Sequence, residues 1–254
     1  MRWVAPALCL FAGCGFSVKG SSAGDAGDAT IDDAATDAET DALLPIDAPI
    51  DAQLCATPPS GQIAWWPGDT VDEVIGNRTS TLVNGAVAGT PGKVGGAFAF
   101  DGFNDRVNVV TDLPALTTFT IEGWIDFDVA GNSSWRTVLG NDNGGRGVWM
   151  KDRRICWYQA SSDRFISDVT ISTTGWHHFA LVYGTDGVFR GYVDGVAAGT
   201  ASYAFASLPA GATIGGYNGY ELDGMIDELS VYDRALTVEE IGAIVAADVH
   251  GKCR

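Results

Sequence analysis

Three acidic residues recur at even spacing near the middle of the chain, and they could carry out hydrolysis. Glu122, Asp126 and Asp128 would share one face of a strand, because side chains alternate between its two faces. Positions two apart on a strand are separated by about 6.7 Å, and retaining glycosidases need carboxyl groups about 5–5.5 Å apart. A pair made of Asp126 and Asp128 is therefore geometrically conceivable. A solvated sheet face carries the same pattern, and no Gly-x-Ser-x-Gly motif is present, so we expect no enzymatic activity.

Two polar segments combine aromatic side chains with hydrogen-bonding partners. Residues 132–136 are Asn-Ser-Ser-Trp-Arg, and residues 216–220 are Gly-Tyr-Asn-Gly-Tyr. Loops on a rigid scaffold commonly carry binding residues, and sugars stack on exposed aromatic rings while polar side chains hold their hydroxyl groups. We therefore predict a ligand-binding site that contains Trp135, Arg136, Tyr217, Asn218 and Tyr220. The alternative is that these aromatic rings only cover the ends of the fold.

The scaffold that positions these residues is predicted to be all-β. In residues 118–127 apolar and polar side chains alternate over most of the segment, which is typical of a half-buried strand. Further strand-like segments are expected at 178–183, 188–193, 212–215 and 225–232. Many short strands at this spacing indicate a sandwich or a barrel. One short helix is expected near the C-terminus, because Thr237 and Glu240 have capping-box spacing ahead of an apolar stripe.

The N-terminus resembles the signal peptide of a bacterial lipoprotein. Arg2 precedes an apolar stretch that is too short to span a bilayer, which needs about 20 residues. The stretch ends in Leu-Phe-Ala-Gly before Cys14, in the manner of a lipobox. The resemblance implies a signal peptide over residues 1–13, lipid on Cys14, and export with anchoring to the outer membrane or cell surface. The alternative is an ordinary signal peptide in which Cys14 has no role.

Residues 14–54 are predicted to form a disordered acidic linker ahead of a domain over residues 55–254. The segment has seven Asp-Ala pairs and nine acidic residues against a single base, Lys19. Such a composition buries too little apolar surface to offset the entropy of ordering, and like charges extend it. The formal net charge of the whole chain is −17. This charge argues against nucleic acid or an anionic membrane surface as a partner, since both bind basic patches.

Three cysteines lie beyond the signal and the linker, and two of them bracket the domain. In an exported protein, Cys55 and Cys253 suggest a disulfide that ties the ends of the domain together. Closing a loop of nearly 200 residues would stabilise the fold by about 5 kcal/mol in the chain-entropy model. Cys156 lies in a strand-like segment, and we expect it to be a buried thiol. There is no Cys-x-x-Cys spacing that would favour a zinc or redox site.

Several segments, in their order and spacing, resemble laminin-G-like, concanavalin A-like jelly-roll domains of bacterial surface proteins. They lie at residues 64–69, 96–102, 119–125, 175–180, 192–195 and 225–236. Together they cover nearly all of residues 60–248. The resemblance implies a jelly-roll sandwich of two antiparallel sheets, and it says little about function because this fold hosts lectins, adhesion modules and hydrolases.

The same resemblance implies a calcium ion at the rim of the sandwich. The matching positions are Asp72, Asn77 and Asp227, whose oxygens are of the kind that calcium binds. The chain departs from the family pattern at 73–75, where Glu-Val-Ile replaces small polar residues. The alternative is that Asp72 and Asn77 serve turn geometry and that Asp227 accepts a backbone hydrogen bond.

Taken together, these features predict a non-catalytic binding module on the cell surface. Its ligand is expected to be a carbohydrate or another extracellular ligand. A protein–protein adhesion or scaffold module is one alternative, and an atypical glycoside hydrolase is another. The identity of the ligand and the oligomeric state do not follow from the sequence.

Overall fold

The computed structural model describes residues 54–111, 113–128, 135–140, 146–159, 162–202 and 211–254. The signal peptide, Cys14 and all of the acidic linker except residue 54 lie outside these residues, so they stay predictions, as does the domain boundary at residue 55. Within the described residues, no helix is long and apolar enough to cross a membrane.

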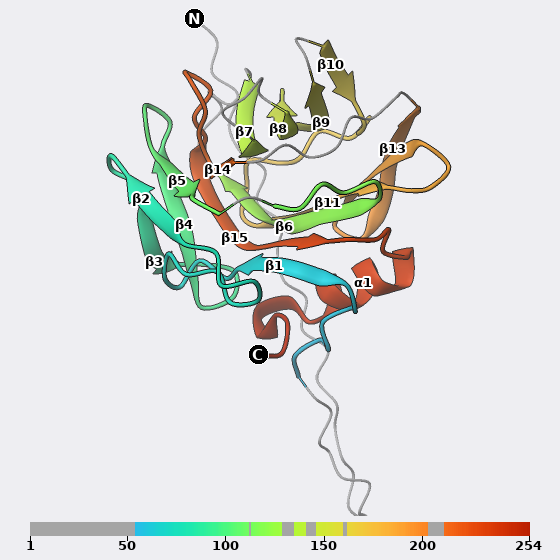
Figure 1. The fold of residues 1–254 in the computed structure, drawn as a ribbon, viewed down its shortest axis with the longest axis horizontal. Helices are drawn as coiled ribbons and strands as arrows, with labels where there is room; N and C mark the ends of the chain where they lie inside the picture. Colours follow the sequence, from blue (N-terminus) through green and yellow to red (C-terminus); the bar gives the residue numbers. More distant parts are fainter. Residues whose placement is uncertain (1–53, 112, 129–134, 141–145, 160–161, 203–210) are drawn as a thin grey trace, which may run out of the picture. The chain divides into compact units, whose positions relative to one another are not determined.

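Two antiparallel sheets make up the fold, as the alternating sequence pattern predicts (Figure 1). The first sheet has the order β13-β12-β11-β6-β15-β4-β3. The first half of β15 pairs with β4, and its second half pairs with β1. Its strands are β1 (Gln62–Trp66), β3 (Val87–Pro91), β4 (Gly96–Asp101), β6 (Phe119–Phe127), β11 (His177–Tyr183), β12 (Val188–Val193), β13 (Val196–Ser202) and β15 (Asp223–Tyr232).

The second sheet has the order β10-β9-β8-β7-β14-β5-β2. Its strands are β2 (Ser80–Val83), β5 (Arg106–Val109), β7 (Trp135–Gly140), β8 (Gly147–Lys151), β9 (Arg154–Gln159), β10 (Ser162–Phe165) and β14 (Ala212–Ile214). Some neighbours in this sheet come from distant parts of the sequence. For example, β14 lies between β7 and β5. Such crossovers confirm the predicted jelly-roll type of sandwich.

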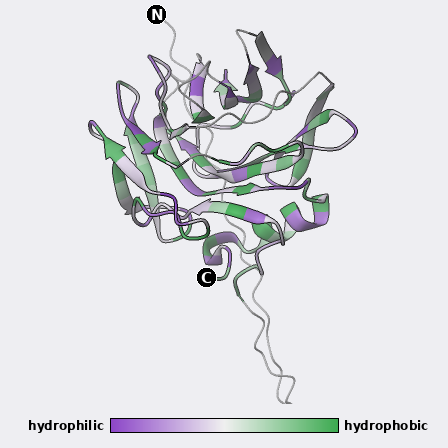
Figure 2. Ribbon diagram, viewed as in Figure 1, coloured by the Kyte–Doolittle hydropathy of each residue, from purple (hydrophilic) through white to green (hydrophobic). Residues whose placement is uncertain are grey.

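The main hydrophobic core fills the space between the two sheets. Phe119 and Phe189 of the first sheet contact Trp157 of the second, with ring centroids 5.4 Å from the tryptophan ring in both cases. All three side chains are fully buried. Figure 2 shows hydrophobic and hydrophilic residues alternating along many of the strands, as expected when one face of each strand points inward. The alternation therefore places one set of side chains in the core and leaves the other set on the outer faces.

The predicted C-terminal helix is α1 (Val238–Ala246), and it covers part of the outer face of the first sheet. Thr237 caps it: its hydroxyl accepts from the backbone N–H of Glu240, whose carboxylate accepts from the backbone N–H of Thr237. This reciprocal pair is the capping box that the sequence predicts. Ile241 and Ile244 of the helix pack in a second, smaller cluster with residues that include Tyr232 of β15. A short 3₁₀ turn, η1 (Asp248–His250), follows.

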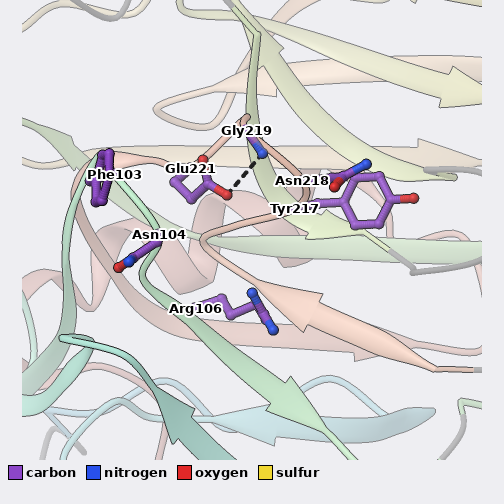
Figure 3. Close-up of a pocket in the computed structure, with 7 residues that line it drawn as sticks. All are labelled: Phe103, Asn104, Arg106, Tyr217, Asn218, Gly219 and Glu221. Carbon is purple, nitrogen blue, oxygen red and sulfur yellow. Dashed lines mark hydrogen bonds between the residues drawn. The ribbon is translucent and has the colours of Figure 1, made fainter.

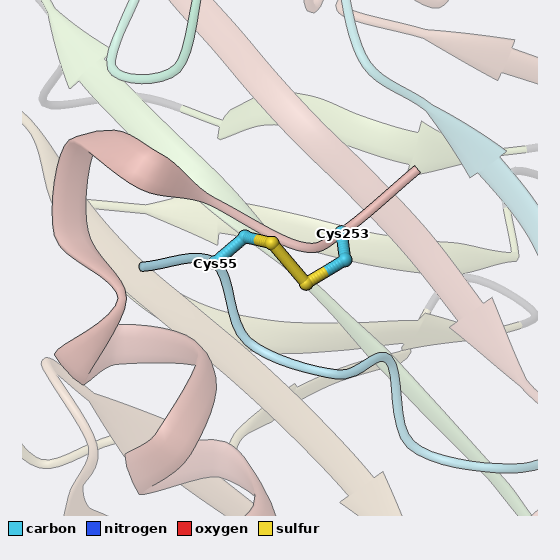
Figure 4. Close-up of a disulfide and its surroundings, with 2 residues drawn as sticks. All are labelled: Cys55 and Cys253. Carbon is cyan, nitrogen blue, oxygen red and sulfur yellow. A yellow bond between two sulfur atoms is a disulfide. The ribbon is translucent and has the colours of Figure 1, made fainter. Parts of the chain in front are cut away.

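The chain ends beside the start of the domain, where Cys55 and Cys253 form a disulfide (Figure 4). Around it, the backbone N–H of Ala56 donates to Gly251 O at 2.8 Å, and the N–H of Cys253 donates to Ala56 O at 2.9 Å. Two backbone hydrogen bonds and one covalent bond thus fix the last residues of the chain to the segment before β1. Cys156 is buried in β9, in line with the sequence prediction.

Candidate functional site

Three of the predicted ligand-binding residues lie in one loop, residues 215–222, between β14 and β15. The N–H of Leu222 donates to Gly215 O at 2.6 Å, and the N–H of Thr137 in β7 donates to Tyr220 O at 2.9 Å. The first bond joins the two ends of the loop to each other, and the second attaches Tyr220 to β7 of the second sheet. Asn218 takes up a left-handed backbone conformation with φ of 51°, which asparagine tolerates better than most residues. The loop therefore presents Tyr217 and Asn218 at the surface in a fixed arrangement.

A hollow of about 620 Å³ lies on one side of this loop (Figure 3). It is lined by Phe103, Asn104, Arg106, Tyr217, Asn218, Gly219 and Glu221. Phe103 is 77% exposed, which is unusual for so large an apolar side chain. The carboxylate of Glu221 accepts from the N–H of Gly219 at 3.0 Å and so braces the loop from within. The hollow thus combines two aromatic rings with hydrogen-bonding side chains, one of which is a cationic arginine and one an acidic glutamate.

Sequence reasoning missed the half of this hollow that comes from the turn between β4 and β5. Phe103 and Asn104 occupy that turn, and Arg106 opens β5. A large apolar residue between Gly102 and Asn104 at the tip of a turn was the available signal. Nothing in the sequence shows that this turn lies against residues 216–221, because the proximity arises from the pairing of β5 with β14.

On the other side of the loop lies a set of packed aromatic rings, which we call the outer aromatic cluster. It consists of Trp135, Trp149, Tyr158, Phe165, Tyr217 and Tyr220. Trp149 lies at its centre, with ring centroids 6.0 Å from Tyr217 and 6.2 Å from Trp135. The structure thus brings Trp135 into one cluster with Tyr217 and Tyr220 through Trp149, a residue outside the predicted set. Trp135 is partly buried by this packing.

Arg136, the fifth predicted residue, does not line the hollow. Its guanidinium donates to the carbonyl oxygen of Trp135 at 3.1 Å. It also lies near Asp223, whose pKa is raised by burial and by the neighbouring Asp128 and is lowered in part by Arg136. Arg136 therefore interacts with the acidic start of β15, which directly follows the loop that carries Tyr217. Residues 132–134, which precede Trp135, lie outside the described part of the chain.

The loop expected to hold calcium is closed by a side chain of the protein itself. Glu73 is buried, and its Oε1 accepts from the N–H groups of Trp65 and Ile75, both at 2.8 Å. Its Oε2 accepts from the N–H of Gly76 at 2.7 Å and lies 3.5 Å from the guanidinium of Arg78. The inside of this loop is therefore lined by N–H groups around a carboxylate. Calcium requires six to eight oxygens instead.

The three residues predicted to bind calcium do not fit a common site in this arrangement. Asp72 and Asn77 are exposed, and Asp72 accepts from the hydroxyl of Thr70 at 3.0 Å. Asp227 is fully buried and accepts from the N–H of Val94 at 2.8 Å. Among the described residues, no group of three or more His, Cys, Asp or Glu side chains could hold a metal ion. Calcium binding stays a prediction drawn from the resemblance.

Asp227 should make the stability of the fold depend on pH. Burial, with a smaller contribution from Glu228, raises its pKa from 3.8 to about 8, although the N–H of Val94 opposes the shift. A carboxyl group with a raised pKa stabilises the fold at low pH, and this contribution is lost as the pH rises from about 4 to about 8. Between pH 5 and pH 8 the wild-type free energy of unfolding should therefore fall by about 3–4 kcal/mol more than that of Asp227→Asn.

Urea unfolding of both proteins at the two pH values measures this difference. Asp186→Asn serves as the matched control, because Asp186 lies at the surface in an ion pair with Arg190. Equal pH dependence in the wild type and Asp227→Asn would show that Asp227 is ionised in the folded protein.

The structure separates Glu122 from the other two carboxylates considered for hydrolysis. Glu122 is fully buried beneath the C-terminal segment, with Oε1 3.1 Å from Lys252 Nζ and Oε2 3.0 Å from His178 Nε2. Asp126 is the penultimate residue of β6, an interior strand of the first sheet, and Asp128 directly follows that strand. Both line a separate hollow of about 470 Å³. Burial, and then the nearby Asp128, raises the pKa of Asp126. Glu122 is thus covered and ion-paired, which removes it from any reaction at that hollow.

Comparisons with known proteins agree with this fold. Residues 101–242, more than half of the chain, match Laminin_G_3, described as the concanavalin A-like lectin/glucanases superfamily. No curated protein sequence matches the chain.

Among solved structures, domain 4 of AbnA, a GH43 extracellular arabinanase from Geobacillus stearothermophilus in complex with arabinotriose, is similar with a TM-score of 0.60 and 18% identity. That match covers 73% of this chain and 98% of the other. The binding domain of Paraclostridial Mosquitocidal Protein 1 gives a TM-score of 0.58 at 17% identity, with 73% of this chain and 52% of that one covered. Trypanosoma rangeli sialidase in complex with DANA gives 0.55 at 15% identity, with 75% and 33% covered.

The chain therefore spans about half of the mosquitocidal structure and a third of the sialidase. At such low identities these similarities show the fold alone. The match over residues 101–242 shows that the chain belongs to the Laminin_G_3 family of concanavalin A-like domains.

Proposed function

We propose that this protein is a non-catalytic binding module that recognises a carbohydrate at the hollow beside residues 215–222. The observation that carries the proposal is the combination of an exposed aromatic side chain, Phe103, with Tyr217 and four polar side chains around one hollow. A sugar ring has apolar C–H faces and a rim of hydroxyl groups. The aromatic rings suit the faces, and Asn104, Asn218 and the charged groups suit the rim.

The structural neighbours support a binding role. The arabinanase domain is in complex with arabinotriose, and another neighbour is the binding domain of Paraclostridial Mosquitocidal Protein 1. Some neighbours are sialidases, so the neighbours alone do not separate binding from catalysis. Glu122 is buried under Lys252, so of the three carboxylates considered for hydrolysis a hydrolase would have to use Asp126 and Asp128.

The site belongs, in this proposal, to an exported protein. A disulfide is typical of proteins in oxidising compartments. We include the predicted lipid on Cys14 and the acidic spacer over residues 14–54, which together would hold the domain away from the membrane surface. The partners would then be an extracellular glycan and, through the lipid, the membrane, with no role for nucleic acid.

Phe103→Ala should weaken glycan binding without loss of stability. Phe103 is 77% exposed, so its truncation leaves no cavity in the core. Removal of an aromatic anchor from a binding site costs about 2 kcal/mol, or about 30-fold in Kd. A glycan array with the full-length chain identifies a ligand, and calorimetric titration then compares the two proteins.

Val196→Ala is the matched control, because Val196 is similarly exposed, at 69%, but lies on β13 of the first sheet. Equal affinity of Phe103→Ala and the wild type would place the glycan elsewhere. Saturable capture of a protein ligand that no sugar displaces would favour the adhesion or scaffold alternative. Release of reducing sugar that is lost on Asp126→Asn would favour the hydrolase.

A further inference from the structure

Charged residues are divided unequally between the two sheets. The strands of the second sheet contain five basic residues and one acidic residue: Arg106, Arg136, Lys151, Arg154 and Arg164, and Asp163. The strands of the first sheet contain six acidic residues and one basic residue: Asp101, Glu122, Asp126, Asp223, Asp227 and Glu228, and Arg190. The whole chain has a net charge of −17, but the strands of the second sheet carry a local excess of positive charge.

Three of these basic residues lie on the outer face of the second sheet, and two of them lie beside aromatic rings. Lys151 Nζ lies 4.7 Å from the ring centroid of Trp135 in the outer aromatic cluster. The guanidinium carbon of Arg154 lies 4.6 Å from the ring centroid of Phe165 in the same cluster. Arg106 is on this face because its strand neighbours Val107 and Val109 point into the core. The outer face therefore carries cations and aromatic rings together.

Arg106 is the cation that reaches the hollow. Its Nε donates to Asn108 Oδ1 at 2.9 Å, which fixes the plane of the guanidinium. This is the only hydrogen bond of its side chain within the described part of the chain, so its Nη groups are available at the wall of the hollow (Figure 3). Glu221 lines the same hollow, and no ion pair joins it to Arg106 among the described residues. A planar fork of N–H donors held in this way matches the oxygens of a carboxylate or sulfate.

We propose that the glycan is anionic, with a carboxylate or sulfate group on Arg106 and its sugar rings along the outer face of the second sheet. This inference rests on the proposed function and names the class of carbohydrate. The distant negative charges of the chain do not oppose it, because at physiological ionic strength charges more than about 8 Å away are largely screened. The nearby carboxylate of Glu221 accepts from the N–H of Gly219. The local pairing of Arg106, Lys151 and the aromatic rings then decides which glycan binds.

Two matched pairs of polysaccharides test the inference with the full-length chain. Polygalacturonate is compared with its carboxyl-reduced, neutral form, and dextran sulfate is compared with dextran. We expect one anionic member to bind at least about ten-fold more tightly than its neutral counterpart, as a charge-assisted hydrogen-bonded pair provides. The pair that shows the difference tells carboxylate from sulfate. Affinity for that anionic member should also fall as salt is added.

Arg106→Gln should abolish this preference while leaving the thermal unfolding temperature unchanged. Arg106→Lys should retain part of it, because it keeps the charge and loses the fork. Arg190→Gln on β12 of the first sheet is the matched control and should bind as the wild type does. Equal binding of neutral and anionic members, with binding still weakened by Phe103→Ala, would overturn the anionic ligand and leave the carbohydrate site standing. No binding of any glycan would overturn both.

Discussion

Replacing Lys252 by methionine should lower the free energy of unfolding by about 3–5 kcal/mol, the range measured when one partner of a buried ion pair is removed. The side chain of Lys252 is 1% exposed, and its Nζ lies 3.1 Å from Glu122 Oε1 and 3.2 Å from Glu228 Oε2. Both carboxylates are as deeply buried as the lysine. Without the ammonium group they would remain in the protein interior with no cation between them.

The electrostatics of Glu122 show how much this cluster depends on Lys252. Burial raises the pKa of Glu122, but Lys252 and His178 together outweigh burial, so the net shift is downward. A lowered pKa means that ionised Glu122 stabilises the fold above its unfolded pKa, and that this contribution is lost on acidification. In Lys252→Met the largest lowering influence is gone. The variant should therefore be destabilised most at neutral pH and should recover stability relative to the wild type as the pH falls.

Urea unfolding at pH 7 and pH 5 measures both effects. Arg190→Met is the control, since the ion pair of Arg190 with Asp186 is at the surface and such pairs contribute less than about 1 kcal/mol. A loss of under 1 kcal/mol in Lys252→Met, equal to the control, would show that the buried cluster contributes nothing beyond an exposed pair.

The parts of this fold that the sequence predicted are those set by neighbouring residues. Alternation in 118–127 predicted β6, and the spacing of Thr237 and Glu240 predicted the start of α1. Both signals depend on residues within one strand or one helical turn. The disulfide was predictable for a different reason, because Cys55 and Cys253 are the two cysteines that bracket the domain.

The parts that were missed depend on contacts between distant segments. Phe103 and Arg106 meet Tyr217 only because β14 pairs with β5, more than 100 residues earlier in the chain. Lys252 and Glu122 are 130 residues apart, and Glu122 looked like one member of a solvated acidic face. A strand pattern shows that two side chains share a face, but it does not show what covers that face.

The disulfide and Lys252 should act on stability together. Cys253 follows Lys252 directly, and the bridge to Cys55 closes a loop with a sequence separation of 198. In the chain-entropy model, opening such a loop by Cys55→Ser with Cys253→Ser lowers the free energy of unfolding by about 5 kcal/mol. The disulfide also fixes the backbone on one side of Lys252. Ala56, the residue after Cys55, pairs with Lys252 through an isolated β-bridge. Loss of the disulfide should therefore loosen the contact of the lysine with Glu122 and Glu228.

A double-mutant cycle measures this dependence. If the disulfide holds Lys252 in place, Lys252→Met should lower the free energy of unfolding by at least about 1 kcal/mol less in the serine background than in the oxidised wild type. The reason is that the effects of substitutions at coupled residues are not additive. The two backbone hydrogen bonds of Ala56 with Gly251 and Cys253 do not involve side chains and should remain in both backgrounds. Full additivity would show that these bonds alone suffice to position Lys252. The bridge would then stabilise the domain only through the entropy of its unfolded chain.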